Sequence, residues 1–315
     1  MNLKSTITVL LLSLIFSGQF IAQTKQRVAT ANKDFENYDY IDAQKVYLKV
    51  VEHGYHSAEI YERLGDTYYF NGDYISSARW YGKLLDTYPA EYDTEFYYRA
   101  AQSMKSAESL DKANELMEKF LSMGGELPKD DVFYDDPDFL KELGLQPSKY
   151  VVESVETNSK YSDFGPAYFN DKLVFSASSK DIDHFGKHNW NNLPYLDLFI
   201  ADMAEDGTLS NARELAGDIN TKYHDASPAF TKDGRTMYFT RNNFLGGRTG
   251  SDSRNTIKLK LYRATSSDGE VWGNVEELPF NSNHYSTSHP TLSKDEKRLY
   301  FASDMPGTLG NSDLW

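Results

Sequence analysis

The side chains with the most evident potential for chemistry surround a pair of histidines in the second half of the sequence. His184 and His188 are four residues apart, with Asp181 and Asp183 just before them. On a helix, this spacing would place two imidazoles on one face, where they could bind a metal ion. Gly, Asn and Pro residues lie close by, so the segment is predicted to be a loop. We therefore expect neither a metal site nor another cofactor.

Two aspartates at equivalent positions form the next candidate site. Asp163 and Asp225 each lie three residues before a proline, whereas the third copy of this pattern has Thr287. Carboxylates at these positions could bind calcium or receive a substrate. Threonine in the third copy does not suit a strict ion site. We interpret the aspartates as caps that accept hydrogen bonds from turn backbone.

The sequence lacks the motifs of several enzyme classes. A serine hydrolase needs Gly-x-Ser-x-Gly on a strand–turn–helix, and no such motif occurs. The Gly-rich residues 246–251 lack the Gly-Lys-Ser/Thr ending of a phosphate-binding loop. The chain has no cysteine, which excludes disulfides, thiol catalysis and Cys-based zinc sites. We therefore expect a protein that is not an enzyme.

The elements that must position these residues are internal repeats, and the first repeat has a period of 34 residues. The recurring residues are Asn37, Asp39, Tyr40, Ile41, Tyr47 and Lys49, which return as Asn71, Asp73, Tyr74, Ile75, Tyr81 and Lys83. This spacing and the residues around it resemble the tetratricopeptide repeat (TPR) family. We expect TPR-like helical hairpins over residues 24–123, stacked because a single hairpin cannot bury its apolar face. Residues 124–149, rich in Gly and Pro, are expected to be a connector.

The second repeat begins at about residue 150. Pro166, Pro228 and Pro290 are evenly spaced along the chain, and an aspartate follows each of them at the same short distance. Short apolar runs alternating with polar residues follow each proline, as in strands that bury one face. Tandem four-stranded units are typical of β-propellers, and this pattern resembles the TolB-like, WD-type blades. The expected fold is thus α+β multidomain, with helical hairpins before an incomplete propeller of about three blades over residues 150–315.

The end of the sequence predicts that this chain is a fragment. Propellers typically have about 4–8 blades, so three cannot close a ring. The third copy stops at Trp315, and residues 150–155 resemble a fourth strand that lacks its first three. An open three-bladed sheet would leave long unpaired edges.

The first 23 residues are predicted to be a signal peptide. Lys4 is the only charged residue among the first 24, and an apolar stretch covers residues 7–16. This stretch is too short to span a bilayer, and no other segment is apolar enough to cross one. We expect a periplasmic protein that is not a lipoprotein, because there is no cysteine to acylate. The net charge of −14 argues against binding nucleic acid.

The order of signal peptide, TPR hairpins and TolB-like blades resembles the periplasmic OmpA-family proteins of Bacteroidota, including those of the type IX secretion and gliding machinery. This resemblance implies a scaffold that tethers envelope machinery to the cell wall. Its partners would be outer-membrane or secretion-system proteins. Peptidoglycan would be bound only by an OmpA-type domain beyond residue 315. Two alternatives remain, namely a glycan-binding propeller and the propeller of a truncated serine peptidase.

Two surfaces are candidates for partner binding. Long loops after the second strand of a blade, at about residues 179–195 and 241–256, are expected on one face. This face would present aromatic and arginine side chains, which are favoured at interfaces, namely Trp190, Tyr195, Phe244 and Arg248. The concave side of the helical stack could bind a peptide through Tyr61, Tyr68 and Tyr97, although most tyrosines there should be core.

Overall fold

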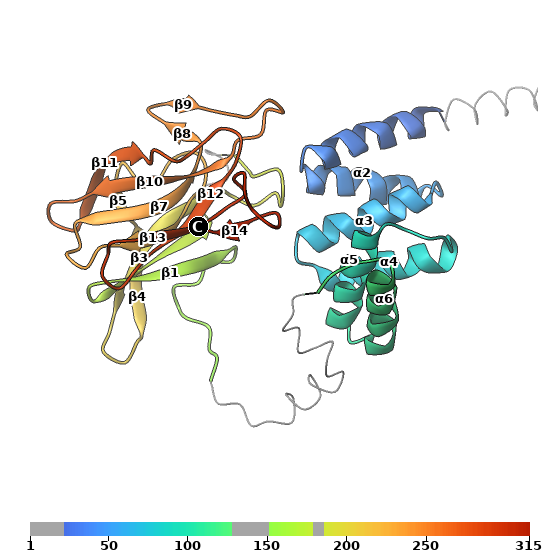
Figure 1. Ribbon diagram of the computed structural model, residues 1–315, viewed down its shortest axis with the longest axis horizontal. Helices are drawn as coiled ribbons and strands as arrows, with labels where there is room; N and C mark the ends of the chain where they lie inside the picture. The colour runs from blue at the N-terminus through green and yellow to red at the C-terminus, as the bar shows by residue number, and fades with distance from the viewer. Residues whose placement is uncertain (1–21, 128–150, 179–185) are drawn as a thin grey trace, which may run out of the picture. The chain divides into compact units, whose positions relative to one another are not determined.

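The computed structural model describes residues 22–127, 151–178 and 186–315 (Figure 1). Its contacts divide the chain into two compact units, one containing Met1–Tyr150 with Asn189–Asn192 and the other containing the remaining residues. Helices form the first unit and strands form the second. Most of the expected signal peptide and connector lie outside the described residues, as do Asp181, Asp183 and His184.

The helical unit consists of consecutive helices that pack against their neighbours. A helix over residues 22–36 precedes α2 (Tyr40–Glu52), α3 (Ala58–Phe70), α4 (Tyr74–Thr87), α5 (Thr94–Ser106) and α6 (Leu110–Ser122). Each helix from α2 to α5 contacts the one that follows it, and Figure 1 shows the chain reversing direction between them. The unit is therefore a stack of helical hairpins, as in TPR-like folds.

Polar side chains define where several of these helices begin. The Ser57 hydroxyl accepts a hydrogen bond from the backbone N–H of Ile60 at 3.3 Å. Asp73 caps α4 in the same way, with Ser76 N at 3.0 Å. Such caps satisfy backbone donors that have no partner inside the helix.

The first repeat is visible in the core of the helical unit. Tyr47 and Tyr81 are fully buried at equivalent positions of α2 and α4. The Tyr47 hydroxyl donates to Asn32 Oδ1 at 2.6 Å, and the Tyr81 hydroxyl donates to Asp66 Oδ1 at 2.6 Å. Gly65 makes room for the second ring, because a Cβ atom there would lie 2.2 Å from Tyr81 Cε1. In each hairpin, the repeated tyrosine on the second helix therefore donates a hydrogen bond to a polar residue on the first helix.

The second unit contains several sheets in chain order (Figure 1). The first is a four-stranded antiparallel sheet of β1 (Asp163–Phe169), β2 (Lys172–Ser178), β3 (Leu196–Met203) and β4 (Leu209–Glu214). The second has the order β5-β11-β10-β7-β6, from β5 (Ala216–Gly217), β6 (Asp225–Phe230), β7 (Thr236–Asn242), β10 (Leu259–Thr265) and β11 (Val271–Glu277). The third contains β12 (Thr287–Leu292), β13 (Leu299–Ser303) and β14 (Asp313–Leu314). A small hairpin pairs β8 (Phe244–Leu245) with β9 (Arg248–Thr249).

The repeated proline marks a bulge in β1, β6 and β12, one strand in each of these three sheets. Gly165, Ser227 and His289, the residues before the three prolines, have positive φ angles of 63°, 50° and 54°. The register shifts at the same place in each first strand. This bulge turns a backbone N–H toward the preceding sheet: Ser227 N donates to Ser176 Oγ, and His289 N donates to Thr240 Oγ1, both at 2.9 Å. The proline-centred repeat thus encodes a bulge that links neighbouring sheets.

One expected strand is absent. Residues 151–155 were predicted to form a fourth strand, but they are exposed and adopt no strand conformation, so that prediction was wrong. Among the strands that the structure describes, none pairs with these residues, and pairing is what stabilises a strand. Across the described residues, the structure has no helix with the length and apolar character needed to cross a membrane.

Candidate interaction surfaces

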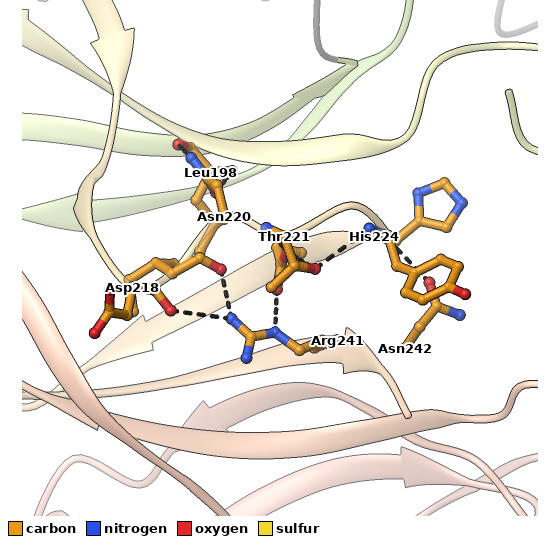
Figure 2. Close-up of polar contacts among 10 residues, drawn as sticks. Leu198, Asp218, Asn220, Thr221, His224, Arg241 and Asn242 are labelled. Atoms are coloured by element: carbon orange, nitrogen blue, oxygen red, sulfur yellow. Dashed lines mark hydrogen bonds and ion pairs between the residues drawn. The ribbon is translucent and has the colours of Figure 1, made fainter. Parts of the chain in front are cut away.

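The connection between the first and second sheets, residues 215–224, is held in place by a polar network (Figure 2). Asn220 bonds to both backbone groups of Leu198 in β3. Its Oδ1 accepts from Leu198 N at 2.8 Å, and its Nδ2 donates to Leu198 O at 3.1 Å. The Leu198 carbonyl also accepts from the backbone N of Leu215 at 2.8 Å, so the asparagine side chain adds to the backbone pairing of β3. Asn281 repeats this arrangement on Leu261 in the second sheet.

A buried ion pair holds the same connection from the other side. Asp225 Oδ2 accepts from the backbone N and the hydroxyl of Thr221, at 2.7 and 2.8 Å. Its Oδ1 accepts from Arg241 Nε, and Arg241 also donates to the carbonyl of Ile219 at 2.5 Å. Burial raises the pKa of Asp225 to about 6, although the Arg241 guanidinium opposes this effect. The prediction that Asp225 caps a turn is therefore confirmed, and the Arg241 guanidinium pairs with its other carboxylate oxygen.

His224 closes the network at its outer end. Its backbone N donates to Asn242 Oδ1 at 3.0 Å, and its Nδ1 accepts from Leu196 N at 3.1 Å. Burial, and then the nearby His188, lowers the pKa of His224 to about 3, so the ring is neutral at physiological pH. The two imidazole centroids are 4.6 Å apart. In the part of the chain that the structure describes, no group of three His, Asp or Glu side chains could hold a metal ion.

The network positions a cluster of aromatic side chains, which we call the aromatic loop surface: Tyr195, Lys222, Tyr223 and Phe244. The ring of Tyr223 lies 5.6 Å from that of Tyr195 and 5.4 Å from that of Phe244. Lys222 Nζ lies 5.1 Å above the Tyr223 ring and 5.3 Å above the Phe244 ring. The structure thus brings the predicted Tyr195 and Phe244 together through Tyr223. Arg248 is exposed on β9, whose residues pair with the strand that contains Phe244.

Lys222 and Tyr223 were not singled out in the sequence, although a signal for them exists. Lys160-Tyr161 occupies the equivalent position in the preceding copy of the repeat, and Tyr285 occupies it in the following copy. Lys160 Nζ lies 5.0 Å above the Tyr161 ring, so the cation–aromatic pair itself recurs. The recurrence of a lysine before a tyrosine in this connection could have identified the surface.

Trp190 packs within the helical unit, whereas it was predicted to share a surface with Tyr195 and Phe244. Residues 189–192 belong to the helical unit, where the Trp190 indole Nε1 donates to the carbonyl of Phe70 at 3.0 Å. Its ring stacks on Tyr38 at 5.7 Å and meets Tyr40 edge-on at 4.9 Å. Trp190 is therefore an anchor inside this chain and is not part of the aromatic loop surface.

The tyrosines predicted for the helical surface have different environments. Tyr61 and Tyr97 are buried, with 3% and 5% of their surface exposed, so both are core residues. Tyr68 is only partly buried and remains available at the surface. The sequence analysis anticipated that most tyrosines of this region would lie between helices.

The first helices of the hairpins share a row of polar contacts, which we call the polar helical face: Asn32, Glu36, Glu59, Arg63, Asp66 and Arg99. Asn32 Nδ2 donates to Glu59 Oε1 at 2.7 Å, and Arg63 bonds to Glu36 at 3.1 Å. Arg99 Nε donates to the buried Asp66 at 2.9 Å. These contacts join the first helices of neighbouring hairpins to one another.

Comparisons with known proteins add a similarity to solved structures. No family model matches this chain, and a search of curated proteins gives no match. Among solved structures, the chain is similar to PcrH in a crystal structure with the chaperone-binding region of PopB. The identity is 18%, and the TM-score is 0.29, over 36% of this chain and 90% of that one.

Proposed function

We propose that this protein is a non-catalytic scaffold that binds protein partners through its helical repeats and through the aromatic loop surface. The observation that carries this proposal is the stack of helical hairpins built from a repeated sequence unit. Stacked hairpins present a continuous surface along their first helices, and this architecture is suited to binding polypeptide segments. Arg63 and Arg99 would supply charge there, and Tyr68 would supply an aromatic contact on another side of α3.

The aromatic loop surface supports the same proposal independently. Tyrosine is enriched at the centre of protein interfaces because its ring is large, rigid and polar at one end. Tyr223 lies in a connection that Asn220 and Asp225 fix to two sheets, and Tyr195 packs against it, so a partner would meet a preorganised surface. Surfaces held rigidly lose less entropy on binding than mobile loops do.

The finer parts of the proposal follow the sequence resemblance. We infer that the sheets are blades of a TolB-like β-propeller, because the strands that follow each repeated proline pair antiparallel with their neighbours and the consecutive sheets contact each other. The order of domains is similar to that of PorE, so we place the protein in the periplasm, among outer-membrane, type IX secretion or gliding components. In that family the role is to tether such machinery to the cell wall.

Site-specific crosslinking in the native host would test the scaffold function. A photoreactive phenylalanine analogue is placed at Tyr68, at Tyr223 or, as a control, at Tyr300 on β13, and crosslinked products are identified by mass spectrometry. We expect the first two positions to capture defined envelope proteins that the control does not capture. Identical products from all three positions, or no products, would overturn the proposal.

A glycan-binding role is the second candidate, favoured by the clustering of Tyr195, Tyr223 and Phe244. Sugars stack on such rings, and Lys222 could bind an acidic saccharide. A glycan array with the full chain and with Tyr223→Ala distinguishes the two functions. Binding that requires Tyr223, without any protein crosslink there, would assign this surface to glycans.

A further inference from the structure

A cavity of about 360 Å³ opens beside the first sheet. Asp163, Phe175, Ala177 and Phe199 line it from β1, β2 and β3, and Glu156 and Thr157 line it from the segment before β1. None of these residues belongs to the aromatic loop surface or to the helical repeats. The cavity is therefore lined by other residues than the surfaces on which the proposed function rests.

Strand pairing shows which residues of the second sheet correspond to this cavity lining. Asp163 pairs with Ala177 in the first sheet, as Asp225 pairs with Arg241 in the second. Two residues before Ala177, Phe175 pairs with Phe199 on the neighbouring strand. Two residues before Arg241, Phe239 pairs with Tyr262 in the same way. The small methyl group of Ala177 thus stands where the second sheet has an arginine side chain.

In the second sheet, that arginine side chain contacts the counterparts of the cavity lining. Its guanidinium lies 5.0 Å from the Phe239 ring and 5.3 Å from the Tyr262 ring. Its nitrogens donate to Asp225 and to the carbonyls of Asp218 and Ile219. In the preceding copy of the repeat, Glu156 and Thr157 occupy the positions of those two carbonyls. The first sheet therefore keeps the carboxylate, the two rings and the matching backbone segment, but Ala177 supplies no cation at the position of Arg241.

The carboxylate of Asp163 is incomplete without a cation. Its Oδ2 accepts from the backbone N and the hydroxyl of Ser159, at 2.8 and 3.0 Å, as Asp225 does from Thr221. Its Oδ1 is buried and has no hydrogen-bond partner among the residues that the structure describes. Leaving a buried carboxylate oxygen unpaired is costly. In the third sheet both members are changed, to Thr287 and Ser303, so no charge is left unpaired there.

We propose that the cavity of the first sheet binds a guanidinium group, held by Asp163 and stacked on Phe175 and Phe199. A guanidinium is planar, always charged and able to donate to a carboxylate and to carbonyls at once, which an ammonium ion does less well. It comes either from an arginine side chain of another polypeptide or from a free guanidino compound. The cavity is large enough for the whole side chain.

Isothermal titration of the full chain tests this site with two compounds of nearly the same shape. Butylguanidinium has the charge and the donors, whereas butylurea is neutral. We expect butylguanidinium to bind at least tenfold more tightly than butylurea, and Asp163→Asn to weaken its binding at least tenfold. Equal binding of the two compounds, or binding unaffected by Asp163→Asn, would overturn the proposal.

A second variant fills the cavity from within. Ala177→Arg should restore the arrangement of the second sheet, raise the midpoint of thermal unfolding and abolish butylguanidinium binding. If the variant fails to fold, the Asp163→Asn comparison still decides the matter. Unchanged binding by a folded Ala177→Arg protein would show that the ligand lies elsewhere.

The source of the guanidinium is resolved by a third titration. A peptide with one central arginine is compared with butylguanidinium and with the same peptide containing citrulline. Tighter binding of the arginine peptide than of butylguanidinium identifies a polypeptide partner. Equal binding of those two identifies a free compound. A citrulline peptide that binds as well as the arginine peptide would contradict the site itself.

Discussion

Ala177 and Arg241 occupy the same register position in consecutive sheets, each opposite an aspartate of the first strand. In the second sheet the pair is an internal ion pair that ties the connection between sheets to β7. In the first sheet the same aspartate keeps its turn contacts without a cation. The difference between Ala177 and Arg241 therefore distinguishes the proposed guanidinium site of the first sheet from the internal ion pair of the second.

Removing the guanidinium from the second sheet should be strongly destabilising. Arg241→Ala leaves Asp225 buried without its cation, so we expect a loss of about 3–5 kcal/mol in the free energy of unfolding. Chemical denaturation measures it, with Arg235→Ala on the surface as the control. Millimolar butylguanidinium should restore part of the lost stability. A loss no greater than that of the control would show that the ion pair contributes little.

Gly65 should not tolerate even one additional carbon. Gly65→Ala places a Cβ atom against the buried ring of Tyr81, and we expect a cost of about 1–3 kcal/mol from this overpacking. Gly82→Ala on α4 is the matched control, because its nearest neighbour would be Met104 Cε at 3.4 Å. That variant should be neutral, or stabilising by up to about 1 kcal/mol through helix propensity. Thermal unfolding of both variants checks the contrast, and equal effects would contradict the packing argument.

The bulge of the first strand needs a residue that accepts a positive φ angle. Gly165 has φ of 63°, and a Cβ atom there would meet Ser176 Oγ and Ser227 Oγ only at 3.5 Å. The cost of Gly165→Ala is thus conformational, and we expect about 1–2 kcal/mol. Gly273→Ala, which has open space and no such φ angle, is the control and should not destabilise. Denaturation midpoints of the two variants provide the measurement.

The contribution of His224 to the stability of the β unit should fall as the pH falls below about 6.5, the ordinary pKa of histidine. The folded-state pKa of His224 is lowered to about 3, so the unfolded chain takes up a proton that the folded chain excludes. The contribution is fully present above the unfolded pKa and is lost progressively toward pH 3. Asp225, with its raised pKa, acts in the opposite direction between about pH 4 and 6.

The variant His224→Gln separates these two effects. It removes the histidine but leaves Asp225 in place, so the free energy of unfolding should decline less steeply between pH 6.5 and 4 than in the native protein. Denaturation curves measured at several pH values give both slopes. Parallel slopes in the two proteins would mean that His224 is not the group responsible.

The periodicities of the sequence already determined the elements of this protein. The constant spacing of the first repeat predicts hairpins whose tyrosines return to the same place, and Tyr47 and Tyr81 do so. The even spacing of the prolines in the second repeat predicts the strands, and the structure shows that a bulge accompanies each proline. Local patterns suffice here because a repeated element meets a similar neighbour each time, so the same residue types are required.

The tertiary structure alone decided which side chains meet. The spacing of the repeated prolines aligns Arg241 with position 179, whereas strand pairing aligns it with Ala177, because the turn between β6 and β7 is longer than that between β1 and β2. Trp190 was predicted beside Tyr195, yet it packs within the helical unit. Pairing register and side-chain burial depend on contacts between residues far apart in the chain, and a sequence pattern does not contain those distances.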